Sequence, residues 1–297
     1  MKGIILAGGS GTRLYPMTSV LSKQLQPIYD KPMIFYPLSL LMLVGIKEVL
    51  IISTERDTPH IEKLLGDGSN FGMTINYLIQ PEPKGLAQAF IIGEDFIGDD
   101  NVTLILGDNL FYGEINFLKN AVADQEAGND GMRARVFGYY VEDPHRYGVV
   151  EIDKKSGQVL GIEEKPKNPR SNYALPGIYI FDNDVSRRAR SQAPSARGEL
   201  EITDLMLSYH REDSLGFQMI GRGVTWLDTG TPESLLEAGH LIAQIEKRQG
   251  LKVACLHEIA YRRGFISREK LKEEIEKLPN CPYRDYVVRV WEEEPAS

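Results

Sequence analysis

Charged side chains suited to phosphate binding follow short apolar segments along this chain. Arg13 closes a glycine-rich run, and Lys23 comes shortly after it. Asp108 and Asp228 each follow an apolar stretch, at 102–106 and at 226–227. Arginine and lysine bind phosphate oxygens, and carboxylates suit a hard cation such as Mg²⁺ that also takes ligands from substrate phosphates. Together these residue types indicate chemistry on a phosphorylated substrate.

The glycine-rich run follows residues 4–7, whose apolar side chains predict a buried strand. Glycine adopts positive φ and lets backbone N–H groups approach a ligand, so this strand end predicts a phosphate site. Neither common phosphate motif fits, because no lysine follows Gly11 and Leu14 replaces the third glycine of a dinucleotide-binding loop. The alternative is a tight turn with a surface arginine. The predicted nucleotide-binding loop consists of Gly8, Gly9, Ser10, Gly11, Thr12 and Arg13.

The two aspartates differ in how well a structural role explains them. Asp108 could cap the next element or hold a metal ion at its strand end, and the sequence leaves both open. The capping role near Asp228 is already filled, because Thr231 and Pro232 are a typical helix N-cap and first helical residue. We therefore predict a functional role for Asp228 and Mg²⁺ as the cofactor of the pair.

Two lysines and a glutamine are weaker candidates for binding phosphate or a nucleobase. Lys23 and Lys165 adjoin proline-containing extended segments, where a lysine is either solvated surface or a point charge for phosphate. Gln80 ends a predicted strand, and its amide offers the donor and acceptor that suit the edge of a nucleobase.

Residues for covalent catalysis form no recognisable pattern in this sequence. The five histidines lack metal-binding spacing, and neither Cys255 nor Cys281 lies in a nucleophile motif. Phosphoryl or nucleotidyl transfer needs no protein nucleophile, because the protein mainly positions the substrates and neutralises developing charge.

Composition narrows the class of protein. The 297 residues are 42% hydrophobic with a net charge of −8, which argues against nucleic-acid partners and anionic membranes. No apolar run reaches the roughly 18 residues of a membrane span, and the first residues lack a signal-peptide pattern. The two cysteines predict no disulfide framework and a reducing, cytoplasmic environment.

Hydrophobic periodicity predicts an α/β fold with a mostly parallel sheet flanked by helices. Strands expected at 4–7, 48–53, 74–80 and 102–106 alternate with helices at 33–44, 58–65 and 85–97. Such spacing brings the loops after the strands to one ligand-binding edge. Beyond about residue 133 the expected strands are at 135–141, 148–152, 159–164, 174–181 and 215–221, and the expected helices at 183–191, 203–211, 232–248 and 267–278.

Ordered motifs along the chain resemble those of the sugar nucleotidyltransferases, especially the branch that makes dTDP-glucose for dTDP-L-rhamnose biosynthesis. The motifs are G-G-S-G-T-R-L-Y-P-M-T at 8–18, S-K-Q at 22–24, Q-P-x-P-x-G-L-A-Q at 80–88, L-G-D-N at 106–109, Y-G-V at 147–149, E-E-K-P at 163–166, G-I-Y at 177–179, R-G-E-L-E-I-T-D at 197–204 and W-L-D-T-G-T at 226–231. They are long, and they keep this order over most of the chain.

The resemblance implies a Rossmann-like nucleotide-diphospho-sugar transferase fold that uses dTTP, glucose 1-phosphate and Mg²⁺. It assigns catalysis to Arg13, Lys23, Asp108 and Asp228, with the two aspartates as metal ligands. It assigns nucleotide binding to the loop at 8–13 together with Gln24, Gln80, Gly85 and Asp108. It assigns sugar-phosphate binding to Asn109, Tyr147, Gly148, Glu164, Lys165, Tyr179 and Arg197.

The resemblance also implies an organisation and an assembly. A core at 1–231 would have a nucleotide half at about 1–130 and a sugar half at about 131–231, with a helical segment at 232–297. The family is usually a homotetramer with a regulatory nucleotide site, which here would draw on Gly113, Arg222 and residues 258–262. The alternatives are a UTP- or CTP-dependent glucose-1-phosphate nucleotidyltransferase and a non-catalytic regulator that binds nucleotide sugars.

Overall fold

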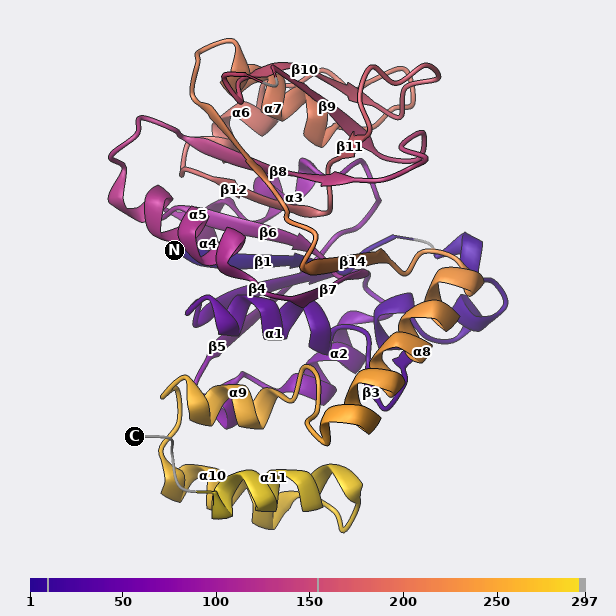
Figure 1. Ribbon diagram of the computed structural model, residues 1–297, viewed down its shortest axis with the longest axis vertical. Helices are drawn as coiled ribbons and strands as arrows, with labels where there is room; N and C mark the ends of the chain where they lie inside the picture. Colours follow the sequence, from indigo (N-terminus) through magenta and orange to yellow (C-terminus); the bar gives the residue numbers. More distant parts are fainter. Residues whose placement is uncertain (10, 154, 294–297) are drawn as a thin grey trace.

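A large mixed sheet lies at the centre of the computed structural model, which describes residues 1–9, 11–153 and 155–293 (Figure 1). Within these residues the strand order is β10-β9-β11-β8-β12-β6-β1-β4-β5, and β13 pairs with β8. The strands of this sheet are β1 (Lys2–Leu6), β4 (Glu48–Ser53), β5 (Thr74–Ile79), β6 (Val102–Leu106), β8 (Ala134–Tyr140), β9 (Gly148–Ile152), β10 (Val159–Glu164), β11 (Tyr173–Ala174), β12 (Ile178–Phe181) and β13 (Leu215–Met219).

The N-terminal part of the sheet is parallel, as predicted. β1 lies between β4 and β6, β4 pairs with β5, and all three pairings are parallel. Both faces of β1 are buried: Ile5 packs with one hydrophobic cluster, while Ile4 and Leu6 pack with the other. A parallel strand covered on both faces has a continuous apolar run of this kind rather than an alternating one.

Helices cover both faces of the sheet (Figure 1). The α-helices are α1 (Phe35–Leu43), α2 (Thr58–Leu65), α3 (Gln88–Ile92), α4 (Glu94–Ile97), α5 (Asn116–Ala127), α6 (Val185–Arg190), α7 (Ile202–His210), α8 (Pro232–Gln249), α9 (Leu256–Arg262), α10 (Arg268–Lys277) and α11 (Pro282–Glu292). Of these, α6 and α7 lie beside β10, and α8 to α11 lie toward the opposite end (Figure 1). The predicted α/β fold is thus confirmed.

Two predicted elements are each divided in the structure. The helix expected at 85–97 is two short helices, α3 and α4, that meet at Gly93. A Cβ at Gly93 would lie 3.0 Å from Leu50 Cδ2 and 3.2 Å from Ile4 Cδ1, so the two helices meet where the chain packs tightly against β4 and β1. The strand expected at 174–181 is β11 and β12, because residues 175–177 cross from β9 to β6 around Pro176, which has no N–H to donate.

Several elements had no counterpart in the prediction. β7 (Asn109–Gly113) and β14 (Val224–Asp228) form a separate antiparallel ribbon in which Asp228 lies opposite Asn109. β2 (Pro27–Ile28) and β3 (Lys31–Pro32) form a small hairpin. The short 3₁₀ helices are η1 (Thr12–Leu14), η2 (Met17–Ser19), η3 (Lys23–Leu25) and η4 (Ser69–Phe71).

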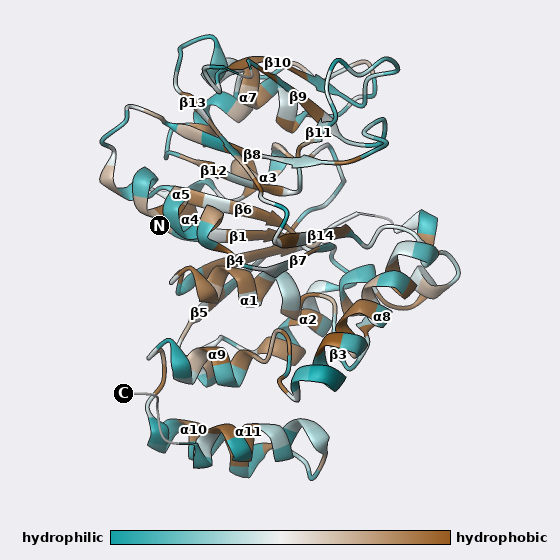
Figure 2. Ribbon diagram, in the orientation of Figure 1, coloured by the Kyte–Doolittle hydropathy of each residue, from teal (hydrophilic) through white to brown (hydrophobic). Residues whose placement is uncertain are grey.

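The C-terminal helices pack below the parallel part of the sheet. Leu256 and Ile259 of α9, Leu271 of α10 and Val287 of α11 belong to the same hydrophobic cluster as Ile5. Figure 2 shows the hydrophobic colour concentrated in the central strands, whereas α10 and α11 carry both hydrophobic and hydrophilic residues. No described helix combines the length and the apolar character that crossing a membrane would require.

Candidate active site

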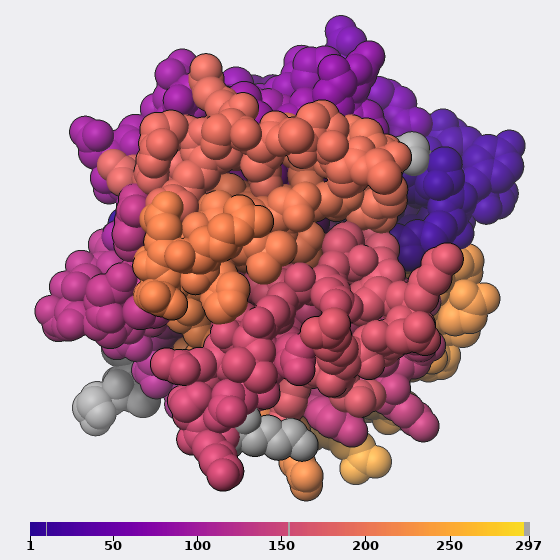
Figure 3. Space-filling model, turned by 90° about the horizontal axis from the view of Figure 1, so that it is seen from above, coloured from indigo at the N-terminus to yellow at the C-terminus, as the bar shows by residue number. Residues whose placement is uncertain are grey.

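A cavity of about 680 Å³ opens at the carboxyl ends of β1 and β6, and both parts of the sheet contribute to its wall. Figure 3, seen from above, shows the chain after the parallel strands, coloured pink to orange, over most of the face toward the viewer, with the indigo N-terminal segment at its side. The predicted site residues that line the cavity are Gly8, Gly9, Arg13, Lys23, Gln24, Gln80, Gly85, Asp108, Asn109, Tyr147, Gly148, Glu164, Lys165, Tyr179, Arg197 and Asp228.

The glycine loop begins directly after β1. Gly8 contacts the side chain of Gln80 so closely that a Cβ at this position would lie 2.2 Å from Gln80 Oε1. Gly9 has a φ of +100°, which favours glycine. Gly11 and Thr12 do not line the cavity, and Ser10 is outside the described residues. The part of the loop that reaches the cavity is therefore Gly8, Gly9 and Arg13.

Arg13 and Asp228 both line the cavity, and both approach Gly230. A Cβ at Gly230 would lie 2.9 Å from Asp228 Oδ1 and 3.1 Å from Arg13 Nη2, so both side chains border this glycine. The helix after it is capped as predicted: Thr231 is the N-cap of α8, accepts a hydrogen bond from Ser234 N and precedes Pro232. Asp228 is thus free of the capping role and lies beside an arginine.

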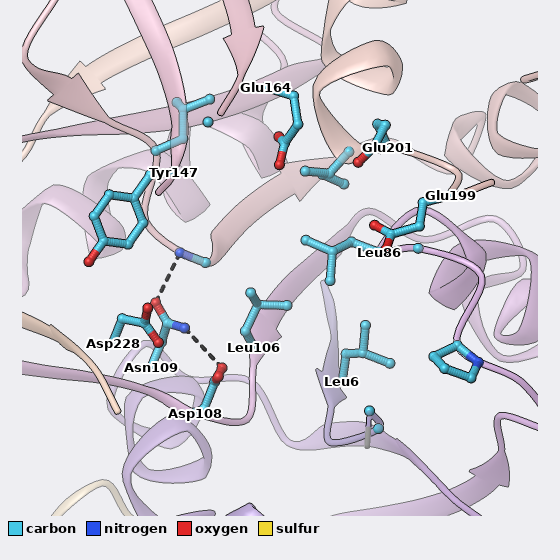
Figure 4. Close-up of a pocket in the computed structure, with 18 of the residues that line it drawn as sticks. Leu6, Leu86, Leu106, Asp108, Asn109, Tyr147, Glu164, Glu199, Glu201 and Asp228 are labelled. Atoms are coloured by element: carbon cyan, nitrogen blue, oxygen red, sulfur yellow. Dashed lines mark hydrogen bonds between the residues drawn. The ribbon is translucent and has the colours of Figure 1, made fainter. Parts of the chain in front are cut away.

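The β7–β14 ribbon places Asp228 next to Asp108. Asp228 is paired with Asn109 in this ribbon, and Thr229 donates from its N and Oγ1 to the Asp108 carbonyl, at 3.1 and 2.7 Å. Figure 4 shows Asp108, Asn109 and Asp228 grouped on one side of the cavity. Two carboxylates far apart in the sequence are therefore neighbours in the site.

The charges around Asp108 and Asp228 act on them differently. Burial opposes ionisation of Asp108, but the Lys23 ammonium that pairs with it and the Asn109 amide that donates to it outweigh burial and lower its pKa. Burial raises the pKa of Asp228, and the negative charge of Asp108 raises it further, against the opposing effect of Lys23 and Arg13. Asp228 is thus a carboxylate whose negative charge is not fully compensated.

This pair fits a hard divalent cation. The described residues contain no group of three or more histidine, cysteine or acidic side chains that could hold a metal ion. Two carboxylates are nevertheless sufficient for Mg²⁺, which keeps several waters and takes further oxygens from substrate phosphates. Burial and the negative charge of Asp108 both raise the pKa of Asp228, and such a cation would relieve the repulsion between the two carboxylates.

Backbone hydrogen bonds join the two sides of the cavity around Gly85. Leu200 N donates to Lys84 O at 2.7 Å, and Ala87 N donates to Leu200 O at 3.2 Å. Gly85 lies between these bonds with a φ of +102°, and a Cβ there would be only 2.4 Å from Leu200 O. Glycine is required here, because both the backbone angle and the close approach exclude a side chain.

The opposite wall is built on the β9–β10 pair. Gly148 of β9 lies opposite Glu164 of β10, and Lys165, with a φ of +44°, forms an ion pair of 3.3 Å with Glu164. Tyr147 packs against Trp226 with ring centroids 5.0 Å apart. Burial raises the pKa of Tyr179, so its hydroxyl stays protonated. This wall offers hydroxyl, carboxylate and ammonium groups, as a polyhydroxy phosphate would require.

Arg197 is held by a carboxylate that the sequence did not single out. Its guanidinium donates to both oxygens of Glu201, at 2.9 and 2.8 Å, and it approaches Glu164 Oε1 at 3.4 Å. Glu201 is buried and also accepts from Ser195 Oγ at 2.7 Å. Figure 4 shows Glu164, Glu199 and Glu201 on the side of the cavity away from Asp108.

Arg146 is a second lining residue that the prediction missed. Its Nη2 donates to Tyr147 Oη at 3.0 Å, and its charge acts on Asp228. Its position directly before the Y-G-V motif was the available signal, but a single exposed arginine has many structural explanations. Glu199 and Glu201 also line the cavity, and their signal in the sequence was stronger because they lie within the R-G-E-L-E-I-T-D motif.

Most of this chain matches one known protein family. A family model described as "Nucleotidyl transferase" matches residues 2–245. The chain belongs to this family. The prediction of a nucleotidyltransferase enzyme is therefore confirmed, and so is the expected fold.

Several relatives of this nucleotidyl transferase are similar over nearly the whole chain. A glucose-1-phosphate thymidylyltransferase of Neisseria meningitidis is 52% identical over 98% of this chain and 99% of its own, and one of Xanthomonas campestris is 51% identical over 96% and 95%. A crystal structure from Bacillus anthracis, described as a candidate glucose-1-phosphate thymidylyltransferase in complex with a sucrose, is 40% identical with a TM-score of 0.74, covering 81% of this chain and 94% of that one. A UDP-glucose pyrophosphorylase complexed with UDP-glucose is 25% identical with a TM-score of 0.72, covering 83% and 99%.

The residues expected at a regulatory site lie away from this cavity. Gly113 ends β7 next to Gly223 and Val224, while Glu258 and Arg262 of α9 form an ion pair of 2.9 Å. None of them lines the cavity. A regulatory role for these residues stays a prediction.

Proposed function

We propose that this nucleotidyltransferase transfers the thymidylyl group of dTTP to glucose 1-phosphate, giving dTDP-glucose and pyrophosphate. One observation carries the proposal: Asp108, Asp228, Lys23 and Arg13 converge between a nucleotide-side loop and a wall of polar sugar-binding groups. The relatives that share about half of their residues with this chain are named for this reaction.

The reaction is a single in-line displacement. A phosphate oxygen of glucose 1-phosphate forms a bond to the α-phosphorus of dTTP, and the bond to the pyrophosphate oxygen breaks. The attacking phosphate is already an anion at neutral pH, so no protein residue needs to remove a proton. This is consistent with a cavity wall that contains no histidine among the described residues.

The cationic side chains of the site offset the charge that develops during the displacement. Lys23 would bind the α-phosphate and Arg13 the leaving pyrophosphate, while Lys165 would bind the phosphate of the sugar. Mg²⁺ held by Asp108 and Asp228 would supply further charge neutralisation between the phosphates. Preorganised charges in a partly enclosed site stabilise such a transition state more than they would in water.

The two walls would hold the two substrates. Gln80 and the Gly85 backbone would contact the thymine edge, and Tyr147, Gly148, Glu164 and Tyr179 would contact the glucose. Thymine differs from uracil by one methyl group, which is worth about 1–3 kcal/mol in an apolar pocket. We therefore expect a preference for dTTP over UTP rather than exclusion of UTP.

Pyrophosphate release measured with a panel of nucleotides and sugar 1-phosphates, with and without Mg²⁺, tests the proposal. The expected result is the highest kcat/KM for dTTP with glucose 1-phosphate, dependent on Mg²⁺. A higher kcat/KM for UTP or CTP would replace dTTP as the substrate. Release with no pair of substrates would overturn the enzyme assignment for this site.

The family resemblance supports three further parts of this proposal. The product would enter dTDP-L-rhamnose synthesis in the cytoplasm, the chain would assemble as a homotetramer, and the helical segment at 232–297 would pack on a core at 1–231. Light scattering of the purified protein tests the assembly. A mass four times that of one chain is expected, and the mass of a monomer would contradict it.

A further inference from the structure

Gln88, the first residue of α3, contacts the base-side residue Gln80 without lining the cavity. Its Oε1 accepts two hydrogen bonds, from Lys84 N at 2.9 Å and from Gln80 Nε2 at 2.8 Å. The first donor belongs to the backbone, and the second belongs to a side chain that is only 5% exposed. Gln88 thus joins a fixed backbone N–H group to the amide of Gln80.

The backbone donor determines how both amides are oriented. A backbone N–H group can only donate, so the atom of Gln88 that faces Lys84 N must be its carbonyl oxygen. The same oxygen faces the Gln80 amide, which must therefore present its NH₂ group. Turning either amide over would place two donors or two acceptors against each other.

The remaining atom of the Gln80 amide is then an acceptor that faces the glycine loop. Gln80 Oε1 lies where a Cβ of Gly8 would come within 2.2 Å of it, and both residues line the cavity. An acceptor in this place is complementary to the N3–H donor of thymine or uracil. In cytosine the same ring position is an acceptor.

We propose that Gln88 is a positioning residue for base selection, which holds the Gln80 amide with its oxygen toward the base so that imide bases are favoured over cytosine. The inference rests on the proposed function, because it takes Gln80 as a contact of the base. Without Gln88 the Gln80 amide can rotate and present either its oxygen or its nitrogen. Discrimination between dTTP and dCTP then falls, although no group that touches the substrates has been removed.

Replacing Gln88 by methionine or by glutamate tests this role. Gln88→Met keeps the length of the side chain and removes the acceptor, whereas Gln88→Glu keeps an acceptor for both donors. We expect Gln88→Met to lower the ratio of kcat/KM for dTTP to that for dCTP about tenfold, mainly through the KM of dTTP. Gln88→Glu should retain the ratio within about twofold, because its carboxylate accepts from Lys84 N and Gln80 Nε2 alike. The KM of glucose 1-phosphate should stay constant in both variants.

A matched control and a binding experiment separate this inference from the proposed function. Gln244→Met, on the exposed surface of α8, should leave the ratio unchanged. Calorimetric titration with dTTP and dCTP reports base selection without turnover, so it can succeed even if the wild-type protein releases no pyrophosphate. Selective binding of dTTP without pyrophosphate release would contradict the proposed function and support the role of Gln88.

Two outcomes would overturn the role of Gln88. One is a Gln88→Met variant that keeps the wild-type ratio, and the other is a Gln88→Glu variant that loses it to the same extent as Gln88→Met. If Gln88→Met does not fold, Gln88→Ser replaces it, because serine suits the start of a helix and is too short to reach Gln80.

Discussion

The two walls of the cavity that we propose to hold the nucleotide and the sugar, here called the nucleotide side and the sugar side, are held in place by different interactions. On the nucleotide side, Gly8, Gln80 and Asp108 follow the parallel strands β1, β5 and β6, so backbone hydrogen bonds set their positions. On the sugar side, Lys165 and Arg197 are positioned largely by ion pairs with glutamates, and both side chains are more than 40% exposed.

This difference predicts different sensitivities. Exposed ion pairs are screened by salt and contribute little stability, whereas the ladder of a buried sheet is insensitive to ionic strength. The nucleotide side should therefore tolerate few substitutions, and the sugar side should change its affinity gradually with salt and with side-chain replacement. Three predictions test this comparison, and a fourth concerns the helices below the sheet.

Asp108→Asn should have the largest effect. The substitution would remove a proposed ligand for Mg²⁺ together with the charged partner of Lys23, so kcat should fall at least about a hundredfold. Titration of the variant with glucose 1-phosphate should give a Kd within about threefold of the wild type, because the sugar wall is unchanged. Turnover near the wild-type rate in the presence of Mg²⁺ would show that the metal assignment is wrong.

Stability measured at different pH values should depend on His257, which lies in α9 below the sheet rather than in the cavity. Burial lowers the pKa of His257 to about 4, against a small opposite effect of Glu274. The unfolded chain, with the ordinary value of 6.5, therefore takes up the proton first as pH falls, and stability is lost between about pH 6.5 and 4. The loss should approach about 3 kcal/mol, since each unit of difference is worth about 1.4 kcal/mol.

Denaturant unfolding at a series of pH values checks this expectation. Above pH 6.5 the residue should contribute no slope, because it is neutral in both states. His257→Gln has no titrating ring, so its stability should vary less between pH 6.5 and 4. An unchanged slope in this variant would assign the acid sensitivity to other groups.

Gly85→Ala tests whether backbone geometry positions the residues of the nucleotide side. The new Cβ would meet Leu200 and would need a φ of +102°, so about 1–3 kcal/mol of stability should be lost and the KM of dTTP should rise. Gly161→Ala in β10 is the control, because no atom lies within 4 Å of its Cβ position. Equal losses in urea unfolding of the two variants would contradict the special role of Gly85.

Glu201→Gln should have the smallest effect and act on the sugar side alone. Without its charge the pair with Arg197 weakens, so the KM of glucose 1-phosphate should rise about tenfold while that of dTTP stays constant. Glu199→Gln, whose ion pair with Arg197 is longer at 3.6 Å, should change it less. Parallel changes in both KM values would mean that the two sides are not independent.

The sequence predicted most of the positions that depend on local pattern. Apolar runs ending in Gly8, Gln80 and Asp108 located the strand ends, and Thr231 with Pro232 located the start of α8. Such signals are local, because strand burial and helix capping are properties of adjacent residues.

Contacts between distant segments were not predictable in this way. The pairing of β7 with β14, which brings Asp228 to Asp108, depends on the register of two segments more than 100 residues apart, and short strands of this kind have little pattern of their own. Glu201 was missed as the partner of Arg197 for a different reason: the two form an i,i+4 pair, but a glutamate at the start of a helix usually has a simpler role. The break at Gly93 lies where the chain packs closely against Leu50 and Ile4, which are distant in the sequence.

The hydrogen bonds between Leu200 and the chain at 84–87 have a consequence for how specificity can evolve. They join the loop beside the proposed sugar wall to the loop proposed to contact the base. An insertion or deletion near residue 200 would therefore also displace Gly85. If the two walls hold the substrates as proposed, a change of sugar should arise most readily from exchanged side chains on β9 and β10, with the backbone around Leu200 kept intact.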